Sequence, residues 1–256
     1  MDGLLSGKKG VVFGIANDRS IGWAIAELAE AQGAEVGIGV QNERMARSAE
    51  KLLDGHAKMH MFEADLNLEE DLERVHQELK AAYGAIDFMV HSVAFALRED
   101  LAGRFIRTSR EGFRVALETS AYSFVAAARA LESILNDDAS LLTMTYLGSQ
   151  RVLPGYNVMG VAKAALEAST RYLAYDLGER GIRVNAVSPG PINTVSARGI
   201  KGFSAILNVV GERVPLKRPA EQEQVATTSL YLLSDLSRGV TGQTLYVDSG
   251  YSSMGS

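Results

Sequence analysis

Cysteine is missing from this sequence of 256 residues, which also contains only five prolines and one tryptophan. Without cysteine, disulfide bridges, thiolate nucleophiles and cysteine-ligated zinc sites are excluded. No apolar run approaches the roughly 20 residues that a membrane span needs, and residues 1–10 lack the apolar core of a secretion signal. We therefore expect a cytoplasmic protein without a membrane partner, and the lack of thiols fits a reducing compartment.

An excess of basic charge is also absent, because 26 lysines and arginines stand against 31 acidic residues and give a net charge of −5. This balance argues against a general nucleic-acid binder. The four histidines show no spacing with carboxylates that suits a metal, so we expect no metal site. With 46% hydrophobic and 22% charged residues, the chain can bury a full core, and we expect one domain over residues 1–256.

Glycine, by contrast, is frequent, with 25 residues against a usual share of about 7%. Short apolar runs that suit strands buried on both faces alternate with segments of helical periodicity. This alternation predicts right-handed βαβ units in a single Rossmann-type doubly wound α/β domain with a seven-stranded parallel sheet. The segment at about 191–217 has neither pattern, and we expect it to cover a ligand. The expected strands are 10–14, 36–40, 58–62, 86–90, 140–144, 182–187 and 243–247, and the expected helices are 21–32, 43–53, 68–82, 110–135, 155–177 and 221–234.

A nucleotide site is expected where the first strand ends, because ligands of doubly wound sheets bind beyond the carboxyl ends of the strands. There, the loop from Gly14 to Gly22 leads into a helix whose amides suit a pyrophosphate. The loop lacks the GxGxxG spacing, so by itself it is a weak signal. No acidic residue ends the second strand. Gln41 suits NAD and Arg44 suits a 2′-phosphate, which leaves the choice between NADH and NADPH open.

The strongest chemical signal is the pair Tyr156 and Lys163, seven residues apart. On one helix they would lie on the same face, roughly 10 Å apart along the axis. Tyr146 leaves the fifth strand toward that face. A phenol near an ammonium group can donate a hydrogen bond or a proton to a developing oxyanion. The spacing alone is equally compatible with a packed tyrosine and a solvated lysine.

These residues resemble the short-chain dehydrogenase/reductase superfamily, and more closely its bacterial-type, NAD-dependent enoyl-[acyl-carrier-protein] reductases. Common members of the superfamily carry Tyr-x-x-x-Lys and a serine seventeen residues before the lysine, where this chain has Met159 and Tyr146. The enoyl reductases instead show the combination of Tyr146, Tyr156 and Lys163. In their reaction the hydride goes to the β-carbon and charge collects on the thioester oxygen, two bonds further from that carbon than in carbonyl reduction, so the acid is displaced from the lysine.

The resemblance, which covers nearly the whole chain, implies an enoyl reductase of fatty-acid elongation that uses NAD, preferably as NADH. It also implies an acyl carrier protein as partner and a homotetramer. The implied catalytic residues are Tyr156, Lys163 and Tyr146, and Ala96, Tyr146 and Tyr156 would contact the substrate. The implied cofactor-binding residues are Gly14, Ser20, Ile21, Gln41, Asp65, Leu66, Val93, Lys163, Ile192, Asn193, Thr194, Val195 and Ser196.

Residues 190–218 carry a local positive charge of +4 within an acidic chain, from Arg198, Lys201, Arg213, Lys217 and Arg218 against Glu212. Such a segment would steer an acidic carrier protein toward the pocket, although a solvated loop with incidental charge explains it equally well. Two alternatives to the enoyl reductase are a short-chain dehydrogenase that acts on a ketone or alcohol and a catalytically idle protein that senses NAD.

Overall fold

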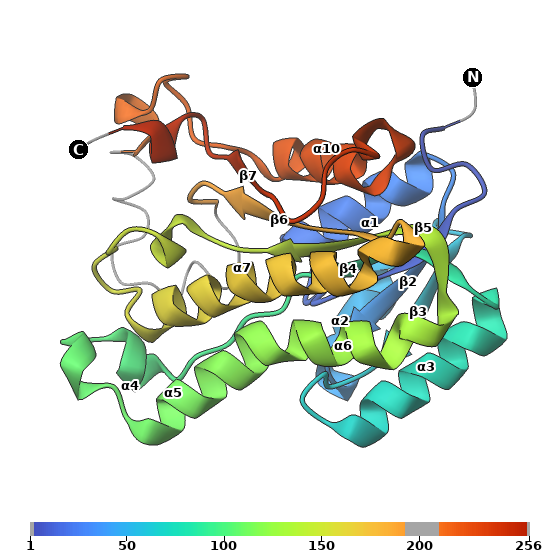
Figure 1. The fold of residues 1–256 in the computed structure, drawn as a ribbon, viewed down its shortest axis with the longest axis horizontal. Coiled ribbons are helices and arrows are strands. Elements are labelled where there is room, and N and C mark those ends of the chain that lie inside the picture. Colours follow the sequence, from blue (N-terminus) through green and yellow to red (C-terminus); the bar gives the residue numbers. More distant parts are fainter. Residues whose placement is uncertain (1–2, 193–209, 255–256) are drawn as a thin grey trace.

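The computed structural model describes residues 3–192 and 210–254, which form one seven-stranded sheet with helices on both faces (Figure 1). All neighbouring strands are parallel, in the order β3-β2-β1-β4-β5-β6-β7. The predicted seven-stranded parallel sheet is therefore confirmed. The strands are β1 (Lys9–Phe13), β2 (Glu35–Val40), β3 (Met59–Glu63), β4 (Ile86–His91), β5 (Leu135–Met144), β6 (Arg183–Pro189) and β7 (Thr244–Val247).

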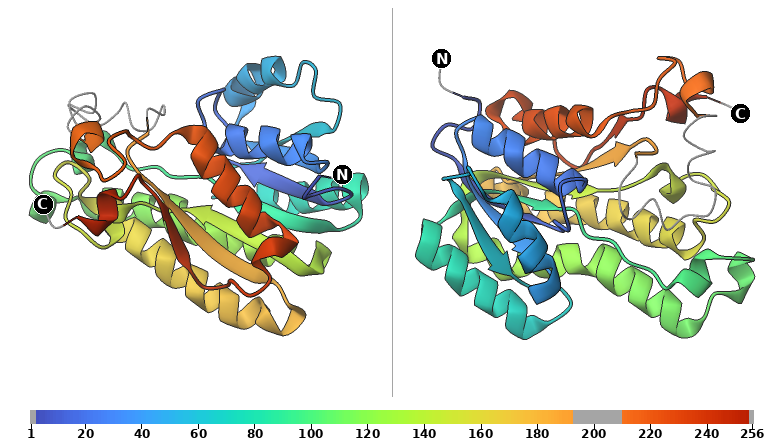
Figure 2. Two further views of the ribbon diagram at one scale, coloured as in Figure 1. Left: turned by 90° about the horizontal axis from the view of Figure 1, so that it is seen from above. Right: turned by 180° about the vertical axis from the view of Figure 1, so that it is seen from behind.

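Two apolar layers hold the helices against the sheet, and Figure 2 shows the helices and the sheet from above and from behind. One layer joins the sheet to α1, α2 and α10, and the other joins it to α3, α6 and α7. Strands β1, β2, β4 and β6 are buried on both faces, which explains their nearly continuous apolar sequences. The longer helices are α1 (Ile21–Ala31), α2 (Glu43–Ala49), α3 (Glu69–Tyr83), α5 (Arg110–Leu117), α6 (Ser123–Leu131), α7 (Val158–Leu177) and α10 (Gln222–Leu233), and α4 (Arg98–Leu101) is a single turn. Within the part of the chain that the structure describes, no helix has the length and apolar character to cross a membrane.

The prediction of one helix over 110–135 was wrong. A π-helical turn at Glu118–Tyr122 separates α5 from α6, and β5 already begins at Leu135. Hydroxyl groups stabilise the interruption: Ser123 Oγ donates to the carbonyl of Thr119 at 2.6 Å, and Ser120 Oγ bonds outside the helix to the backbone of Phe95. Such side-chain bonds compete with the regular α-helical ladder.

The predicted start of the helix over 155–177 was also wrong, because α7 begins at Val158. Its N-cap residue, Asn157, has a positive φ of 41°, and the Asn157 amide donates to the carbonyls of Leu101 and Gly103 at 3.1 and 3.3 Å. Tyr156 therefore lies in the turn before α7, rather than on the helix two turns from Lys163.

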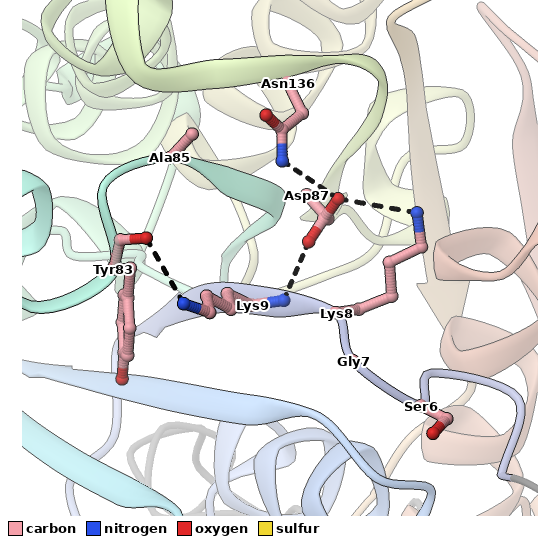
Figure 3. Close-up of a pocket in the computed structure, with 8 residues that line it drawn as sticks. All are labelled: Ser6, Gly7, Lys8, Lys9, Tyr83, Ala85, Asp87 and Asn136. Atoms are coloured by element: carbon pink, nitrogen blue, oxygen red, sulfur yellow. Dashed lines mark hydrogen bonds and ion pairs between the residues drawn. The ribbon is translucent and has the colours of Figure 1, made fainter.

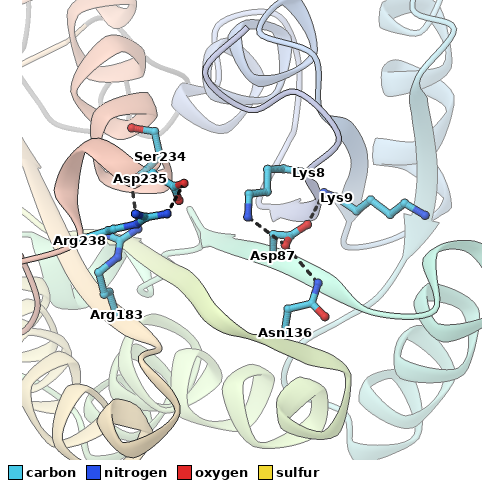
Figure 4. Close-up of polar contacts among 8 residues, drawn as sticks. All are labelled: Lys8, Lys9, Asp87, Asn136, Arg183, Ser234, Asp235 and Arg238. Atoms are coloured by element: carbon cyan, nitrogen blue, oxygen red, sulfur yellow. Dashed lines mark hydrogen bonds and ion pairs between the residues drawn. The ribbon is translucent and has the colours of Figure 1, made fainter. Parts of the chain in front are cut away.

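The amino-terminal edge of the sheet is fastened by polar side chains. Asp87 accepts hydrogen bonds from the Lys8 ammonium, the Lys9 amide and the Asn136 side chain, beside a cavity of about 440 Å³ (Figure 3). At the same edge the buried Arg183 donates to carbonyls at the end of α10, including that of Ser234 at 3.2 Å (Figure 4). These contacts tie β1, β4 and β5 together and fasten β6 to α10 at one edge, and the carboxyl ends of the strands lie at the other.

Candidate functional site

The order of the strands reverses between β1 and β4, and here the chain leaves two neighbouring strands toward opposite faces. Gly14 ends β1 with φ of +92°, and a Cβ atom at this position would lie 2.2 Å from the carbonyl oxygen of Ser92. Only glycine allows this close approach of the two backbones. This switch point lies at the carboxyl edge of the sheet, where doubly wound proteins bind nucleotides.

The loop after β1 presents a helix N-terminus at this edge. Ser20 Oγ accepts from the amides of Ala16 and Asn17 at 3.0 and 3.1 Å, which fixes the loop. The amides of Ile21 and Gly22, at the start of α1, have no acceptor among the described residues, and the first turn of the helix holds no acidic residue. Free amides and the positive end of the helix dipole favour an anion here.

The ends of β2 and β3 are joined through two of the predicted cofactor residues. Gln41 Nε2 donates to Asp65 Oδ2 at 3.0 Å, and Asp65 Oδ1 accepts from the Asn67 backbone and side chain. The neighbouring Leu66 is 5% exposed and belongs to the core layer of α3. The structure thus brings Gln41, Asp65 and Leu66 together, one strand width beyond the loop at Gly14.

The remaining cofactor positions follow β4 and β6. Val93 and Ile192 are half-buried at the carboxyl edge, and each packs against one of the two core layers. The predicted residues Asn193, Thr194, Val195 and Ser196 lie outside the described residues, as do positions 197–209 of the predicted covering segment.

Tyr146 and Tyr156 meet at the carboxyl end of β5. Their ring centroids are 5.0 Å apart with an interplanar angle of 66°, an edge-to-face contact. The Tyr156 ring also lies directly over Gly148, since a Cβ atom on this glycine would be 2.3 Å from Tyr156 Cδ1. Gly160, on the first turn of α7, approaches the Gly148 carbonyl equally closely, as its own Cβ would lie 2.6 Å from that oxygen. Two glycines therefore set the position of the Tyr156 ring.

Both tyrosines are kept in their neutral form. Burial raises the pKa of Tyr146 to about 12, with a further contribution from Tyr251. Burial raises the pKa of Tyr156 still further above its ordinary value, and the neighbouring Tyr146 adds to the effect. A phenol that keeps its proton at neutral pH donates a hydrogen bond, so this pair suits an acceptor that gains negative charge.

Lys163 extends from α7 toward the end of β5. Its side chain is 5% exposed and donates to the carbonyl of Met144 at 2.7 Å. Burial lowers the pKa of Lys163 to about 8, while Glu167 acts in the opposite direction. The ammonium form therefore predominates at neutral pH, within reach of the same strand end that carries Tyr146.

Ala96 packs beside the start of α7, where it contacts the small apolar cluster of Ala116, Val158 and Ala162. The predicted substrate contact is thus on the same side of the site as Tyr156.

Three buried or tightly packed residues in this region were missed by sequence reasoning: Ser120, Gly148 and Glu167. Glu167 carried a usable signal, because it is a lone acid within an apolar stretch of helix, four residues after Lys163.

Comparison with known proteins gives consistent matches over nearly the whole length. Residues 14–252 match the family described as Enoyl-(Acyl carrier protein) reductase. Enoyl-[acyl-carrier-protein] reductase [NADH] 1 of Rhizobium meliloti is 47% identical, covering 99% of this chain and 93% of that protein. Enoyl-[acyl-carrier-protein] reductase [NADPH] FabI of Staphylococcus aureus is 45% identical, covering 96% of this chain and 97% of that protein. The crystal structure of the Bacillus cereus enoyl-acyl carrier protein reductase with NADP+ and indole naphthyridinone has a TM-score of 0.97 and 46% identity, over 99% of this chain and 100% of the other.

Proposed function

This chain belongs to the enoyl-(acyl carrier protein) reductase family, and from this premise we propose that it reduces the double bond of a trans-2-enoyl thioester during fatty-acid elongation. The observation that carries the assignment is the contact between Tyr146 and Tyr156 next to the buried Lys163. In this arrangement the acid precedes α7, and Met159 stands where a carbonyl reductase has its tyrosine.

The residues at the carboxyl edge fit a nicotinamide dinucleotide, because free amides and small residues line its path. Ile21, after Ser20 and the turn at Gly14, would hold the pyrophosphate at the start of α1, and Gln41 and Asp65 would hold the adenosine. Lys163 would bind the hydroxyls of the nicotinamide ribose. The other contacts would come from Leu66, Val93, Ile192, Asn193, Thr194, Val195 and Ser196.

When bound, the reduced cofactor supplies the hydride for the β-carbon of the enoyl chain. Electrons of the double bond then move toward the thioester carbonyl, whose oxygen becomes an enolate. The neutral Tyr156 donates a hydrogen bond to this oxygen, and the Lys163 ammonium adds positive potential. Tyr146 flanks the thioester and Ala96 contacts the acyl group. The α-carbon takes up a proton to complete the saturated thioester.

We propose NADH as the preferred cofactor, because Gln41 after β2 suits NAD, and we propose that NADPH is accepted as well. The end of β2 carries Gln41 rather than an acid, so no carboxylate at that position would repel a 2′-phosphate. Arg44, exposed at the start of α2, is a cation that suits this phosphate. Relatives of both specificities are about equally similar to this chain.

The function is tested by mixing the purified protein with NADH and a crotonyl thioester. Oxidation of NADH is measured as the loss of its absorbance. We expect turnover with the crotonyl thioester and none with an acetoacetyl thioester, whose ketone is the substrate of a carbonyl reductase. Folded protein that oxidises neither NADH nor NADPH with the enoyl thioester would contradict the proposal. Turnover of the ketone alone would show instead that the protein is a short-chain dehydrogenase.

An acyl carrier protein is the proposed physiological substrate carrier. The segment with a local charge of +4 includes three exposed cations in the described residues from 210 onward, namely Arg213, Lys217 and Arg218. Carrier proteins of this class are strongly acidic, so the charges are complementary.

Reversing Arg198 and Lys201 to glutamate should raise KM for a carrier-bound enoyl substrate by about tenfold, because two favourable charges become repulsive. KM for a neutral enoyl thioester of N-acetylcysteamine should stay within a factor of two. The matched control reverses Lys58 and Lys80, which are exposed near the opposite edge of the sheet. Equal changes of KM for both substrates would argue against carrier binding by this segment.

We also infer that residues 1–256 form one cytoplasmic domain that assembles into a homotetramer. The family match over 14–252 supports the single domain, and the absence of cysteine is compatible with a reducing compartment. Tyr172 and Tyr175 on α7 are 75% and 84% exposed, an aromatic surface that suits contact with another copy. Sedimentation equilibrium should give the mass of four chains, and a stable monomer would contradict the tetramer.

A further inference from the structure

A buried carboxylate lies next to the catalytic residues without a role in the mechanism above. Glu167 is on α7, one helical turn after Lys163, and is 6% exposed. Its Oε1 accepts hydrogen bonds from Thr145 Oγ1 at 2.7 Å and from Ser149 Oγ at 2.6 Å. Burial of a carboxylate is unfavourable unless other groups compensate the charge, so its presence here calls for a specific reason.

The two hydroxyl donors enclose the segment that carries the tyrosine contact. Thr145 directly precedes Tyr146, and Ser149 directly follows Gly148, which supports the ring of Tyr156. A single oxygen atom of Glu167 therefore holds both ends of this segment against α7. Movement of either end would shift Tyr146, or would change the surface on which Tyr156 rests.

The same carboxylate also compensates the charge of Lys163. Lys163 donates to the carbonyl of Met144, and Glu167 accepts from the next residue, Thr145, so the two oppositely charged side chains bind adjacent residues at the end of β5. The titratable groups around this pair include His91 from β4, Tyr246 from β7, and Tyr146 and Tyr156 from the connection between β5 and α7, and the charges of Asp248 and Arg151 act on Tyr246.

The histidine and the three tyrosines among these groups carry no charge near neutral pH. Burial and the charge of Lys163 lower the pKa of His91 to about 3, so this histidine is neutral. Burial raises the pKa of Tyr246, as it does for the two site tyrosines. Within the described residues, Glu167 is the charged group that offsets the effect of burial on Lys163.

Resting on the proposed reductase function, we propose that Glu167 is a positioning residue of the active site. Through Thr145 and Ser149 it holds the segment that bears Tyr146 and Gly148, and it places a negative charge one helical turn from the Lys163 ammonium group.

The variant Glu167→Gln separates these two effects, because glutamine keeps an acceptor for both hydroxyls and loses the charge. We expect the pKa of Lys163 to fall by about one unit. The basic limb of the kcat profile, measured with NADH and a crotonyl thioester, should move to lower pH by the same amount. The pKa itself is read without cofactor or turnover from ¹³C NMR of protein labelled at lysine Cε, with the Lys163 resonance assigned from Lys163→Arg.

Two controls give the opposite pattern. Thr145→Val combined with Ser149→Ala removes both hydrogen bonds and keeps the charge, so kcat should fall by about tenfold across the pH range while the Lys163 titration changes little. Asp176→Asn removes an exposed negative charge from the same helix and should change neither quantity.

A folded Glu167→Gln protein whose Lys163 titrates at the parent pH would overturn the proposal. If this variant does not fold, Glu167→Asp keeps the charge on a shorter side chain, and it should lower kcat without moving the basic limb; a shifted limb in this variant would count against the assigned role of the charge. Failure of the reductase function itself is distinguishable, because the parent protein would then not oxidise NADH, whereas the NMR titration would still report on Glu167.

Discussion

Tyr156→Phe should lower kcat for reduction of the crotonyl thioester by about 100-fold, because the enolate oxygen loses its neutral hydrogen-bond donor. The bond strengthens as charge develops, so kcat and kcat/KM should fall together while KM changes little. Phenylalanine keeps the edge-to-face contact with Tyr146, whose ring centroid lies 5.0 Å away. The loss should therefore occur without a change in the thermal midpoint of unfolding.

The matched control for this variant is Tyr231→Phe, which removes a hydroxyl on α10 and leaves the site intact. Steady-state kinetics and thermal melts on the parent and the two variants are sufficient. A Tyr156→Phe protein with kcat within a factor of two of the parent would mean that the oxyanion is stabilised by another group, and the role assigned to Tyr156 would be wrong.

Gly148→Ala should cost about as much activity, although residue 148 bears no reactive group. The added Cβ would lie 2.3 Å from Tyr156 Cδ1, so the ring must move. A displacement of about 1 Å at a catalytic group lowers kcat by about 100-fold. Overpacking at such a contact also destabilises a protein by about 1–3 kcal/mol, which a thermal or denaturant melt measures.

Gly178→Ala provides the control for the added methyl group. No atom lies within 4 Å of the Cβ position at Gly178, and its φ of −64° is helical. This variant should keep the parent kcat and the parent stability or slightly more. Normal turnover by Gly148→Ala would show that the position of the Tyr156 ring tolerates movement, contrary to the geometry described above.

The fold was predictable because its signals are local. Strands such as β2 and β6 are buried on both faces, and their apolar sequences stand out between amphipathic helices. The predicted sheet also indicated the carboxyl edge as the nucleotide site, because the topology of a parallel sheet determines where ligands bind. The structure places Gly14, Ser20 and Gln41 at this edge, as expected.

The parts that were predicted wrongly depend on contacts between distant segments. The interruption at Glu118–Tyr122 involves the hydroxyl bonds of Ser120 to Phe95 and of Ser123 to His91. The start of α7 depends on the bonds from Asn157 to carbonyls more than 50 residues earlier. The prediction that Tyr156 and Lys163 lie two turns apart on one helix was wrong, because only Lys163 is on the helix.

Asp87 stabilises the amino-terminal edge of the sheet, whereas the proposed active site lies at the carboxyl edge. It joins β1, β4 and the start of β5 through Lys9 and Asn136 at the edge that lies away from the catalytic residues. A protein engineer who seeks thermostability can therefore work on this edge, and one who seeks a new substrate range can vary the residues around Ala96 and Tyr146. The two kinds of substitution are far enough apart in the sheet for their free energies to combine additively.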